Sequence, residues 1–439
     1  MNSQPTGLNS LRFKLGTLFI LYVTVFLTRI GFGTILIIFP DTRYLNVSSS
    51  GVVGLIIASY PLVEGVAALP VGAYIDRRGR RRAFVLGMSL ISVLTLILGL
   101  TNDVLIVGVT HAMMGLSAAL VTISSLTMIT DLTGVQNRGA GMGGFDFANL
   151  GGYGIGILLG LFFSTIFNRL GNAFIVVSAI FAAATVFIYF FLREPPHTSE
   201  KRKSLREMYE SLTGEVSAIF PLWFSMTIIT GMYFFLPRLA SRASTEPGRV
   251  LSSSSAPTII LGLLILGAGA LFFGRLSDKI GRTRTIMIGV AGEIGFLLVF
   301  PELFQKLVLI PPGQSFLITI QEVGVLGIFG GIMFFLGSAL VPTILAFVGD
   351  KAAHEYRGSA MGLYSLMLSA GIALGTVLAG LADDIGSQGG LNPQAGIQAV
   401  FYTGVIIFST LSLTSGLLLR RNRLAPIGPD LAKSETRPL

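Results

Sequence analysis

The sequence Gly72-Ala73-Tyr74-Ile75-Asp76-Arg77-Arg78-Gly79-Arg80-Arg81-Arg82 connects two long apolar stretches, and a second copy, Gly274-Arg275-Leu276-Ser277-Asp278-Lys279-Ile280-Gly281-Arg282-Thr283-Arg284, connects two more. Among the positions that recur at the same steps in both copies are Gly72, Asp76, Gly79 and Arg80 in the first, and Gly274, Asp278, Gly281 and Arg282 in the second. A further pair follows, because Asp131 precedes Arg138 by the interval that separates Asp350 from Arg357. The repetition predicts two related halves.

The composition predicts an integral membrane protein. Of the 439 residues, 52% are hydrophobic and only 12% are charged, so a soluble domain of this length would expose too much apolar surface. Apolar runs of roughly 20 residues, enough to cross a hydrocarbon core of about 30 Å as helix, follow one another along the chain. We count twelve such runs, six in each half, of which the last but two extends from Ser315 to Phe347. An all-α protein with twelve transmembrane helices is therefore expected.

Positive charge is concentrated in alternate loops, among them Arg77 to Arg82 and Arg275 to Arg284. The intervening loops hold fewer cations, namely Arg43, Arg169, Arg238, Arg242, Arg249 and Lys306. Because cytoplasmic loops carry the positive excess, both termini are expected in the cytoplasm of a multi-pass protein of the plasma (inner) membrane. The net charge of +9 then follows from this rule and from attraction to the lipid bilayer, and it does not indicate nucleic-acid binding.

The chain divides at a charged interruption between the two halves. Residues 1–192 are predicted to form an N-terminal six-helix bundle and residues 218–420 a C-terminal one. Residues 193–217, with Pro195 and Pro196, are predicted to form a cytoplasmic linker, either an amphipathic helix on the membrane surface or a solvated segment. Residues 421–439 are expected to be a disordered cytoplasmic tail.

At the repeated motifs the chain resembles the major facilitator superfamily, whose signature G-x-x-x-D-R-x-G-R-R lies between helices 2 and 3 and recurs between helices 8 and 9. The resemblance spans nearly the whole chain and implies two pseudo-symmetric six-helix bundles. It also implies that the loop aspartate meets the start of helix 11 and that the following arginine pairs with the acid after helix 4. Carried onto this chain, these groups are Asp76, Arg80 and Asp131 in one half, and Asp278, Arg282 and Asp350 in the other.

The motif residues are interpreted as a conformational gate. A loop carboxylate gains from the dipole at the N-terminus of a helix in the opposite half only when that side of the protein is closed. The alternative is that the arginines only fix the topology, which is the interpretation favoured for Arg77, Arg78 and Arg81. The gate is expected to comprise Gly72, Asp76, Gly79, Arg80, Asp131, Arg138, Gly274, Asp278, Gly281, Arg282, Asp350 and Arg357.

A few ionisable residues fall inside the apolar runs, where they are usually paired and functional. Arg29, Glu64 and His111 are expected in the middle-to-outer layer of the first half, where a carboxylate and an imidazole can exchange protons. Asp146 and Asn149 are expected near the central cavity. These five residues are the predicted proton-coupling and substrate residues. The alternative is a static buried ion pair of Arg29 and Glu64 with a hydrogen-bonded histidine.

Two departures from the family pattern concern coupling and direction. His111 occupies the place of the family's helix 4 arginine, four residues before Gly115, which weakens the carry-over of that arginine's role. Helix 5 carries no Gly-Pro pair of the kind typical of drug:proton antiporters. Glu293 is in helix 9, which is peripheral in this family, so we expect a packing or snorkelling residue there.

Glycines recur every four residues in helix 5 and helix 11, a spacing that lets helices approach closely. We interpret these stripes as helix-packing surfaces on which the two halves would rock. The residues are Gly152, Gly156, Gly160, Gly371 and Gly375.

The sequence predicts a secondary active transporter that moves a small organic solute, with a slight preference for an anionic metabolite, by alternating access coupled to protons. The alternatives are a multidrug/proton antiporter and, from another class, a non-transporting receptor or sensor. An enzyme is disfavoured because no catalytic constellation can be assembled, and the nucleotide-binding G-x-x-x-x-G-K-[ST] loop does not occur. No cofactor is expected. Nor is a metal site, since the chain has no cysteine and three scattered histidines. The expected oligomeric state is a monomer.

Overall fold

The structure is a computed structural model that describes residues 7–41, 43–132, 138–194, 214–243, 256–307, 316–351, 357–389 and 391–424. Every regular element within these ranges is an α-helix. The helices of the first half are α1 (Gly7–Ile38), α2 (Ser50–Arg78), α3 (Arg80–Leu100), α4 (Val104–Leu132), α5 (Arg138–Ile166) and α6 (Gly171–Phe191). Most of the predicted linker and of the predicted tail lies outside the described residues.

The helices of the second half are α8 (Gly214–Phe234), α9 (Leu236–Ala243), α10 (Ala256–Ile280), α11 (Arg282–Leu307), α12 (Phe316–Gly337), α13 (Leu340–Lys351), α14 (Arg357–Gly386) and α15 (Pro393–Leu424). Within the described residues, 11 helical spans are long and apolar enough to cross a membrane, and α5 contributes a shorter apolar stretch, Gly151–Ile166. The all-helical membrane fold is therefore confirmed.

Two of the predicted spans are divided in the structure. The run from Ala218 to Leu239 is interrupted at Phe235, between α8 and α9. The apolar run from Ser315 to Phe347 was expected to be one helix, but it is divided into α12 and α13 by a turn at Ser338 and Ala339. Helix α12 also departs from helical backbone geometry at Gly324, whose φ of 51° lies in the left-handed region that favours glycine. Hydropathy is continuous across the break, so the apolar pattern alone does not predict it.

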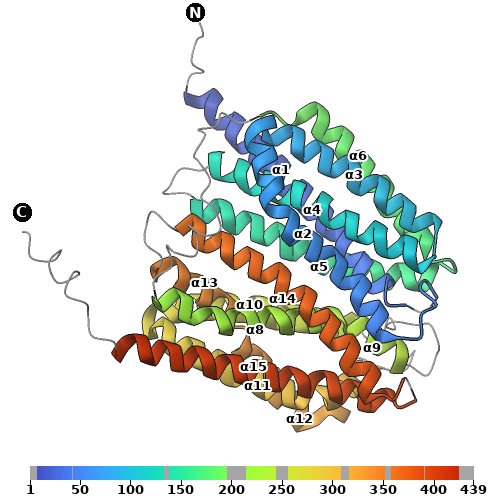
Figure 1. The fold of residues 1–439 in the computed structure, drawn as a ribbon, viewed down its shortest axis with the longest axis vertical. Coiled ribbons are helices and arrows are strands. Elements are labelled where there is room, and N and C mark those ends of the chain that lie inside the picture. The colour runs from blue at the N-terminus through green and yellow to red at the C-terminus, as the bar shows by residue number, and fades with distance from the viewer. Residues whose placement is uncertain are drawn as a thin grey trace, which may run out of the picture.

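The helices of the two halves form two adjacent groups, with α1 to α6 in the upper part of Figure 1 and α8 to α15 in the lower part. In the first half α1 packs on α5, and α4 packs on α2 and α3; in the second half α8 packs on α14 and α15. The main contact between the halves is α2 against α14. The hydrophobic core of the second half also takes in Val53, Ile57 and Leu161 of the first half, so apolar packing continues across the interface.

The predicted glycine stripes lie at close helix contacts within each half. A Cβ atom at Gly156 of α5 would lie 2.2 Å from the carbonyl oxygen of Ile30 in α1, and one at Gly375 of α14 would lie 2.0 Å from that of Ile228 in α8. Gly152, Gly160 and Gly371 are equally crowded, by Phe26, Ile37 and Thr227 respectively. All five glycines therefore pack helices of the same half, and the expectation that they form the surface between the halves is wrong.

We expect Gly156→Ala to destabilise the protein, because backbone at 2.2 Å cannot move aside as a side chain would. Gly154→Ala is the matched control: it lies in the same helix, and its nearest neighbour, the Leu263 side chain, is at an ordinary 3.4 Å. Thermal unfolding of the detergent-purified variants measures the difference. Helix propensity alone would raise the melting temperature of both variants, because alanine favours a helix more than glycine does. A melting temperature of Gly156→Ala that is no lower than that of Gly154→Ala would therefore exclude the α1–α5 contact as a constraint.

Candidate functional site

Two ends of the helix bundle are distinguished by their charges. The basic end carries the repeated motifs, with the α2–α3 junction at Gly79 and the α10–α11 junction at Gly281. The two junction glycines have φ values of 93° and 94°, a backbone conformation that other residues rarely adopt. This explains why both copies carry glycine there. The opposite end holds the start of α2, the helix α9 and the end of α14.

The start of α3 at the basic end is bound by an acid that the sequence analysis did not consider. Glu194, which follows α6, accepts hydrogen bonds from the backbone N–H groups of Arg80 (2.7 Å) and Arg81 (2.8 Å). Arg81 in turn donates to the carbonyl oxygens of Leu192 and Tyr189. The helix dipole and the unpaired N–H groups of a first turn favour a carboxylate at this place. These hydrogen bonds connect the start of α3 to the end of α6.

In the second copy the motif residues bind each other. Arg282 Nη1 lies 2.7 Å from Asp278 Oδ1, and the Asp278 side chain is 64% exposed. Asp278 therefore makes no ion pair with the opposite half in this conformation, and the contact expected of it when this side is closed stays a prediction. A Cβ atom at Gly274 would meet nothing within 4 Å, whereas Gly72 is buried. The other five predicted gate side chains lie outside the described residues: Asp76, Asp131, Arg138, Asp350 and Arg357.

Arg29 of α1 is half-buried between helices of the first half. Its guanidinium donates hydrogen bonds to the hydroxyls of Tyr153 in α5 (3.2 Å) and Thr122 in α4 (3.4 Å). The same group lies over the rings of Phe32 and Tyr153, at 5.5 Å and 5.4 Å from their centroids. These cation–π contacts and neutral hydroxyls stabilise the charge without neutralising it. The guanidinium therefore stays available for an anion.

Glu64 is at the midpoint of α2, and the structure brings it close to Arg29 through a third residue. The Thr122 hydroxyl donates to Glu64 Oε1 at 3.5 Å and accepts from Arg29 Nη2 at 3.4 Å. Among the ion pairs of the described residues, none joins Arg29 directly to Glu64. The predicted pair is thus a bridged one. Such a pair separates more readily than a direct bidentate contact.

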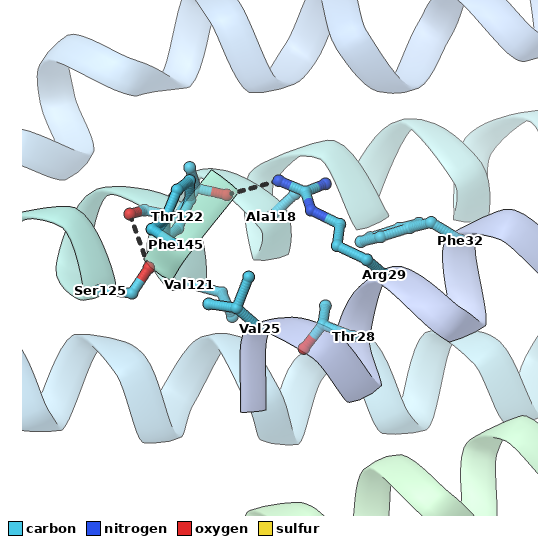
Figure 2. A pocket seen from close by; sticks show the side chains of 9 residues that line it. All are labelled: Val25, Thr28, Arg29, Phe32, Ala118, Val121, Thr122, Ser125 and Phe145. Atoms are coloured by element: carbon cyan, nitrogen blue, oxygen red, sulfur yellow. Dashed lines mark hydrogen bonds between the residues drawn. The ribbon is translucent and has the colours of Figure 1, made fainter. Parts of the chain in front are cut away.

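A small pocket opens beside Arg29. Figure 2 shows the Arg29 side chain reaching toward Thr122, with Val25, Thr28 and Phe145 along the wall. Its cavity volume is about 10 Å³, enough for roughly one water molecule. Ligand sites are usually about 300–1,000 Å³, so an organic solute needs the surrounding helices to move apart.

The other predicted coupling residues are placed differently. His111 is buried in an aromatic cluster with Phe39 and Tyr60, and its Nδ1 is 2.9 Å from the carbonyl oxygen of Ile56. It contacts neither Arg29 nor Glu64 by any hydrogen bond in the described residues. Asn149 has a buried side-chain oxygen for which the described part of the chain offers no hydrogen-bond partner. The Asp146 side chain lies outside the described residues.

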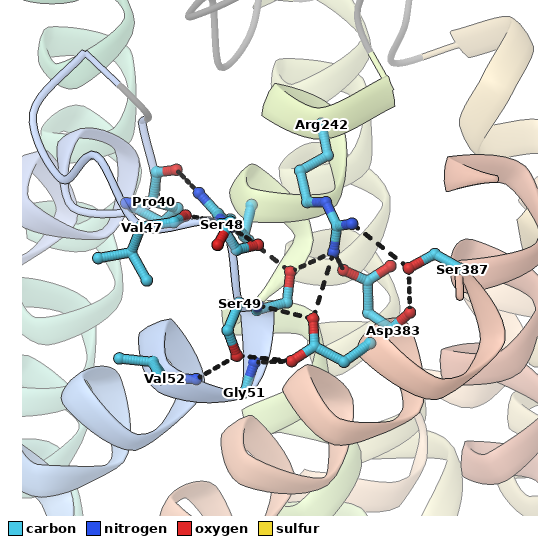
Figure 3. Close-up of polar contacts among 12 residues, drawn as sticks. Pro40, Val47, Ser48, Ser49, Gly51, Val52, Arg242, Asp383 and Ser387 are labelled. Carbon is cyan, nitrogen blue, oxygen red and sulfur yellow. Dashed lines mark hydrogen bonds and ion pairs between the residues drawn. The ribbon is translucent and has the colours of Figure 1, made fainter. Parts of the chain in front are cut away.

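The opposite end is built around Asp384 of α14, which caps α2. Its carboxylate accepts hydrogen bonds from the backbone N–H groups of Ser50 and Gly51, both at 2.8 Å, and from the Ser49 hydroxyl at 2.7 Å. Figure 3 shows Ser49 and Gly51 at the first turn of α2, below Arg242 and beside Asp383 of α14. A carboxylate at a helix N-terminus pairs otherwise unsatisfied donors and complements the dipole. This contact joins the second half to the first.

Arg238 of α9 makes a second contact between the halves. It is 1% exposed, and it donates to the carbonyl oxygens of Pro40 (3.3 Å), Val47 and Ser48 (3.3 Å) in the segment that precedes α2. Beside it Arg242 binds Asp383, the neighbour of Asp384 in α14. We call this set, namely Arg238, Arg242, Asp383, Asp384 and the segment 40–51, the opposite-end clamp.

The clamp also orders the connection between α1 and α2. Asp41 is fully buried and bonds Arg43, with Oδ2 2.7 Å from Nη2. Burial raises the pKa of Asp41 above its ordinary value, although the bonds from Arg43 oppose the shift. Sequence reasoning missed the clamp because it counted Arg238 and Arg242 as loop cations. The only local signal was Ser49-Ser50 before an apolar run, a helix N-cap pattern.

Comparison with known proteins finds matches over most of the chain. A family model described as Major Facilitator Superfamily matches residues 19–304 and 258–439. Multidrug resistance protein 2 and Multidrug resistance protein 1 of Bacillus subtilis (strain 168) are each 24% identical to the chain. The alignments cover 84% of this chain and 89% and 90% of the two relatives.

Solved structures have the same fold. A bacterial homologue of the human lysosomal transporter Spinster, in an inward-facing and unoccupied conformation, superposes with a TM-score of 0.72 at 16% identity. The match covers 97% of this chain and 100% of that one. The nucleoside transporter NupG gives a TM-score of 0.63 at 12% identity, over 93% and 98% of the two chains.

Proposed function

The chain belongs to the major facilitator superfamily and is a membrane transporter, and from that premise we propose that it moves a small organic solute by alternating access coupled to protons. The observation that carries the proposal is the bridged pair of Arg29 and Glu64, which lies half-buried beside a small pocket in the first half. A carboxylate and a guanidinium that form no direct ion pair can separate. The guanidinium can then bind a ligand while the carboxylate takes up a proton. The basic end is cytoplasmic in this proposal.

The coupling follows from competition for one guanidinium. With no solute bound, Arg29 stabilises the ionised form of Glu64 through Thr122. When an anionic group binds Arg29, the carboxylate loses that stabilisation, and a buried carboxylate without a cation takes up a proton. Solute binding and protonation of Glu64 therefore favour each other.

Alternating access follows from the contacts between the halves. The opposite-end clamp joins α2 to α14 and to α9, while Asp278 at the basic end is solvent-exposed and bound to Arg282. In the proposed cycle the clamp holds the outer side shut in this conformation. Its bonds break when the protein opens outward, and the basic-end motifs then close the cytoplasmic side.

Arg29→Met is expected to weaken binding of the transported solute at least about tenfold if the solute is anionic, since charge-assisted hydrogen bonds are worth about 1.5–3 kcal/mol. Thermal stabilisation of the purified protein by a panel of organic anions measures the effect. Arg169→Met serves as the control, because Arg169 is a cation outside the pocket that donates to the carbonyl oxygens of Gly99 and Leu100. Equal stabilisation of wild type and Arg29→Met by the active solute would exclude Arg29 as its ligand.

Efflux of multiple drugs in exchange for protons is the second candidate. The specific observation is that the two Bacillus subtilis relatives, matched over most of their length, are named multidrug resistance proteins. Aromatic rings that line the pocket, Phe32 and Phe145, suit flat apolar cations. In this case Glu64 and not Arg29 would contact the substrate, so Arg29→Met would leave drug binding unchanged or improve it.

A further inference from the structure

A buried carboxylate lies in the other half of the molecule, away from Arg29 and Glu64. Glu293 is 2% exposed in the interior of α11, eleven residues from Arg282, which corresponds to about 16 Å along the helix. This places it near the middle of the membrane span Arg282–Lys306. Of the two expected roles, packing and snorkelling, the snorkelling role is therefore wrong, because the carboxyl group does not reach the surface.

One oxygen of the carboxyl group has a specific donor. The Tyr233 hydroxyl of α8 donates to Glu293 Oε1 at 2.8 Å. The ring of Tyr233 packs against Phe296 and Phe300, whose centroids are 6.4 Å and 6.3 Å away. Aromatic side chains thus fix the donor and exclude water from this side.

The other oxygen faces the break between α12 and α13. A Cβ atom at Gly337, the last residue of α12, would lie 2.7 Å from Glu293 Oε2. At the neighbouring Gly292 the backbones of α11 and α12 are also close, since a Cβ atom there would lie 2.5 Å from Gly337 N. The carboxyl group therefore occupies a slot that exists only because residue 337 has no side chain.

The charged residues on the helices around Glu293 lie far from it along those helices. Tyr233 of α8 is the titratable group bonded to it, and no ion pair of the described residues includes Glu293. The cations and acids of α10, α11 and α15 lie toward the helix ends, and the side chains of Glu322 in α12 and Asp350 in α13 lie outside the described residues. The groups at the helix ends are Arg275, Asp278, Lys279, Arg282, Arg284, Glu302, Lys306, Arg420 and Arg421, and Tyr402 of α15 is 46% exposed.

We propose that Glu293 is a proton-binding site in the second half, occupied by an exchangeable proton in this conformation. An ionised carboxylate at this depth, with one neutral hydroxyl donor, is destabilised by several kcal/mol relative to the neutral acid. A proton from water bonds to Oε2, and Tyr233 keeps its own proton and donates to Oε1. The site holds its proton whatever solute is carried and does not depend on Glu64.

Infrared difference spectra of the purified protein between acidic and alkaline buffers test the site. We expect a carbonyl band of a protonated carboxylic acid that disappears on alkaline titration and is absent in Glu293→Gln. In Tyr233→Phe the band should move to higher frequency, because the acid carbonyl loses a hydrogen bond. Glu302→Gln is the matched control, since Glu302 lies in the same helix but is 51% exposed.

Two results would overturn the assignment. A Glu293→Gln spectrum identical to that of wild type means that Glu293 carries no proton, and a band that never titrates while the protein stays folded means that the acid is static. If Glu293→Gln does not fold, Gly337→Ala replaces it, because the added methyl group must displace Oε2 and shift the same band. The spectra need no solute, so their failure is distinct from a failure of solute-coupled proton transport.

Discussion

Glu64→Gln is expected to abolish accumulation of solute driven by a proton gradient while leaving the exchange of labelled for unlabelled solute intact. The amide keeps the size and hydrogen-bonding capacity of a protonated acid but never ionises. Because Glu64 shares Thr122 with Arg29, the substitution leaves a permanently neutral partner beside the guanidinium. Solute binding is then no longer linked to proton uptake, and the carrier should run as an uncoupled exchanger.

Two assays on the same proteoliposomes separate these effects, one with an imposed pH gradient and one for counterflow at equal pH. Glu302→Gln controls for the loss of a carboxylate, because Glu302 is half-exposed and bound to Lys306. Gradient-driven accumulation by Glu64→Gln at the wild-type level would remove Glu64 from the coupling mechanism. Loss of both activities would assign Glu64 to solute binding or to folding.

Arg238→Met is expected to open the opposite end of the molecule. The substitution preserves much of the apolar stem but leaves the carbonyl oxygens of Pro40, Val47 and Ser48 without their charged donor. Hydrogen bonds to charged groups contribute about 1.5–3 kcal/mol each. Losing about 3 kcal/mol shifts a two-state equilibrium roughly 150-fold. The closed form should therefore cease to be the main population.

Spin-label distances measure this shift directly. The chain has no native cysteine, so cysteines placed at Leu105 of α4 and Leu391 before α15, which are 75% and 86% exposed, are the only reactive ones. Arg169→Met is the matched control: Arg169 also donates to two backbone carbonyls at this end, those of Gly99 and Leu100, but within the first half. A distance distribution of Arg238→Met that coincides with that of Arg169→Met would exclude the clamp as a gate.

Much of the fold could be predicted because its determinants are local. Apolar runs of membrane-spanning length, the basic loops and the duplicated motif of Asp76 and Asp278 are each read from neighbouring residues. The division of one predicted span into α12 and α13 could not be read in this way. It depends on packing at Gly337, where α11 approaches the backbone, and the sequence around it remains apolar.

The candidate site was predictable in part. Partial burial of Arg29 and Glu64 followed from their place in apolar runs, and the structure adds that Thr122 connects them. The clamp could not be foreseen, because Arg238 and the segment around Val47 are separated by 191 residues and no sequence spacing relates them. Glu293 was assigned to the periphery by family analogy, whereas its burial is set by Tyr233 and Gly337 of this chain.

The most direct test of solute transport coupled to protons is the external pH of proteoliposomes containing the wild-type protein, recorded as organic anions and cationic drugs are added in turn. The account predicts a pH change that depends on one class of solute, scales with its uptake and collapses when a protonophore is present. Uptake of a solute with no accompanying pH change would contradict it, since the carrier would then use another ion or none.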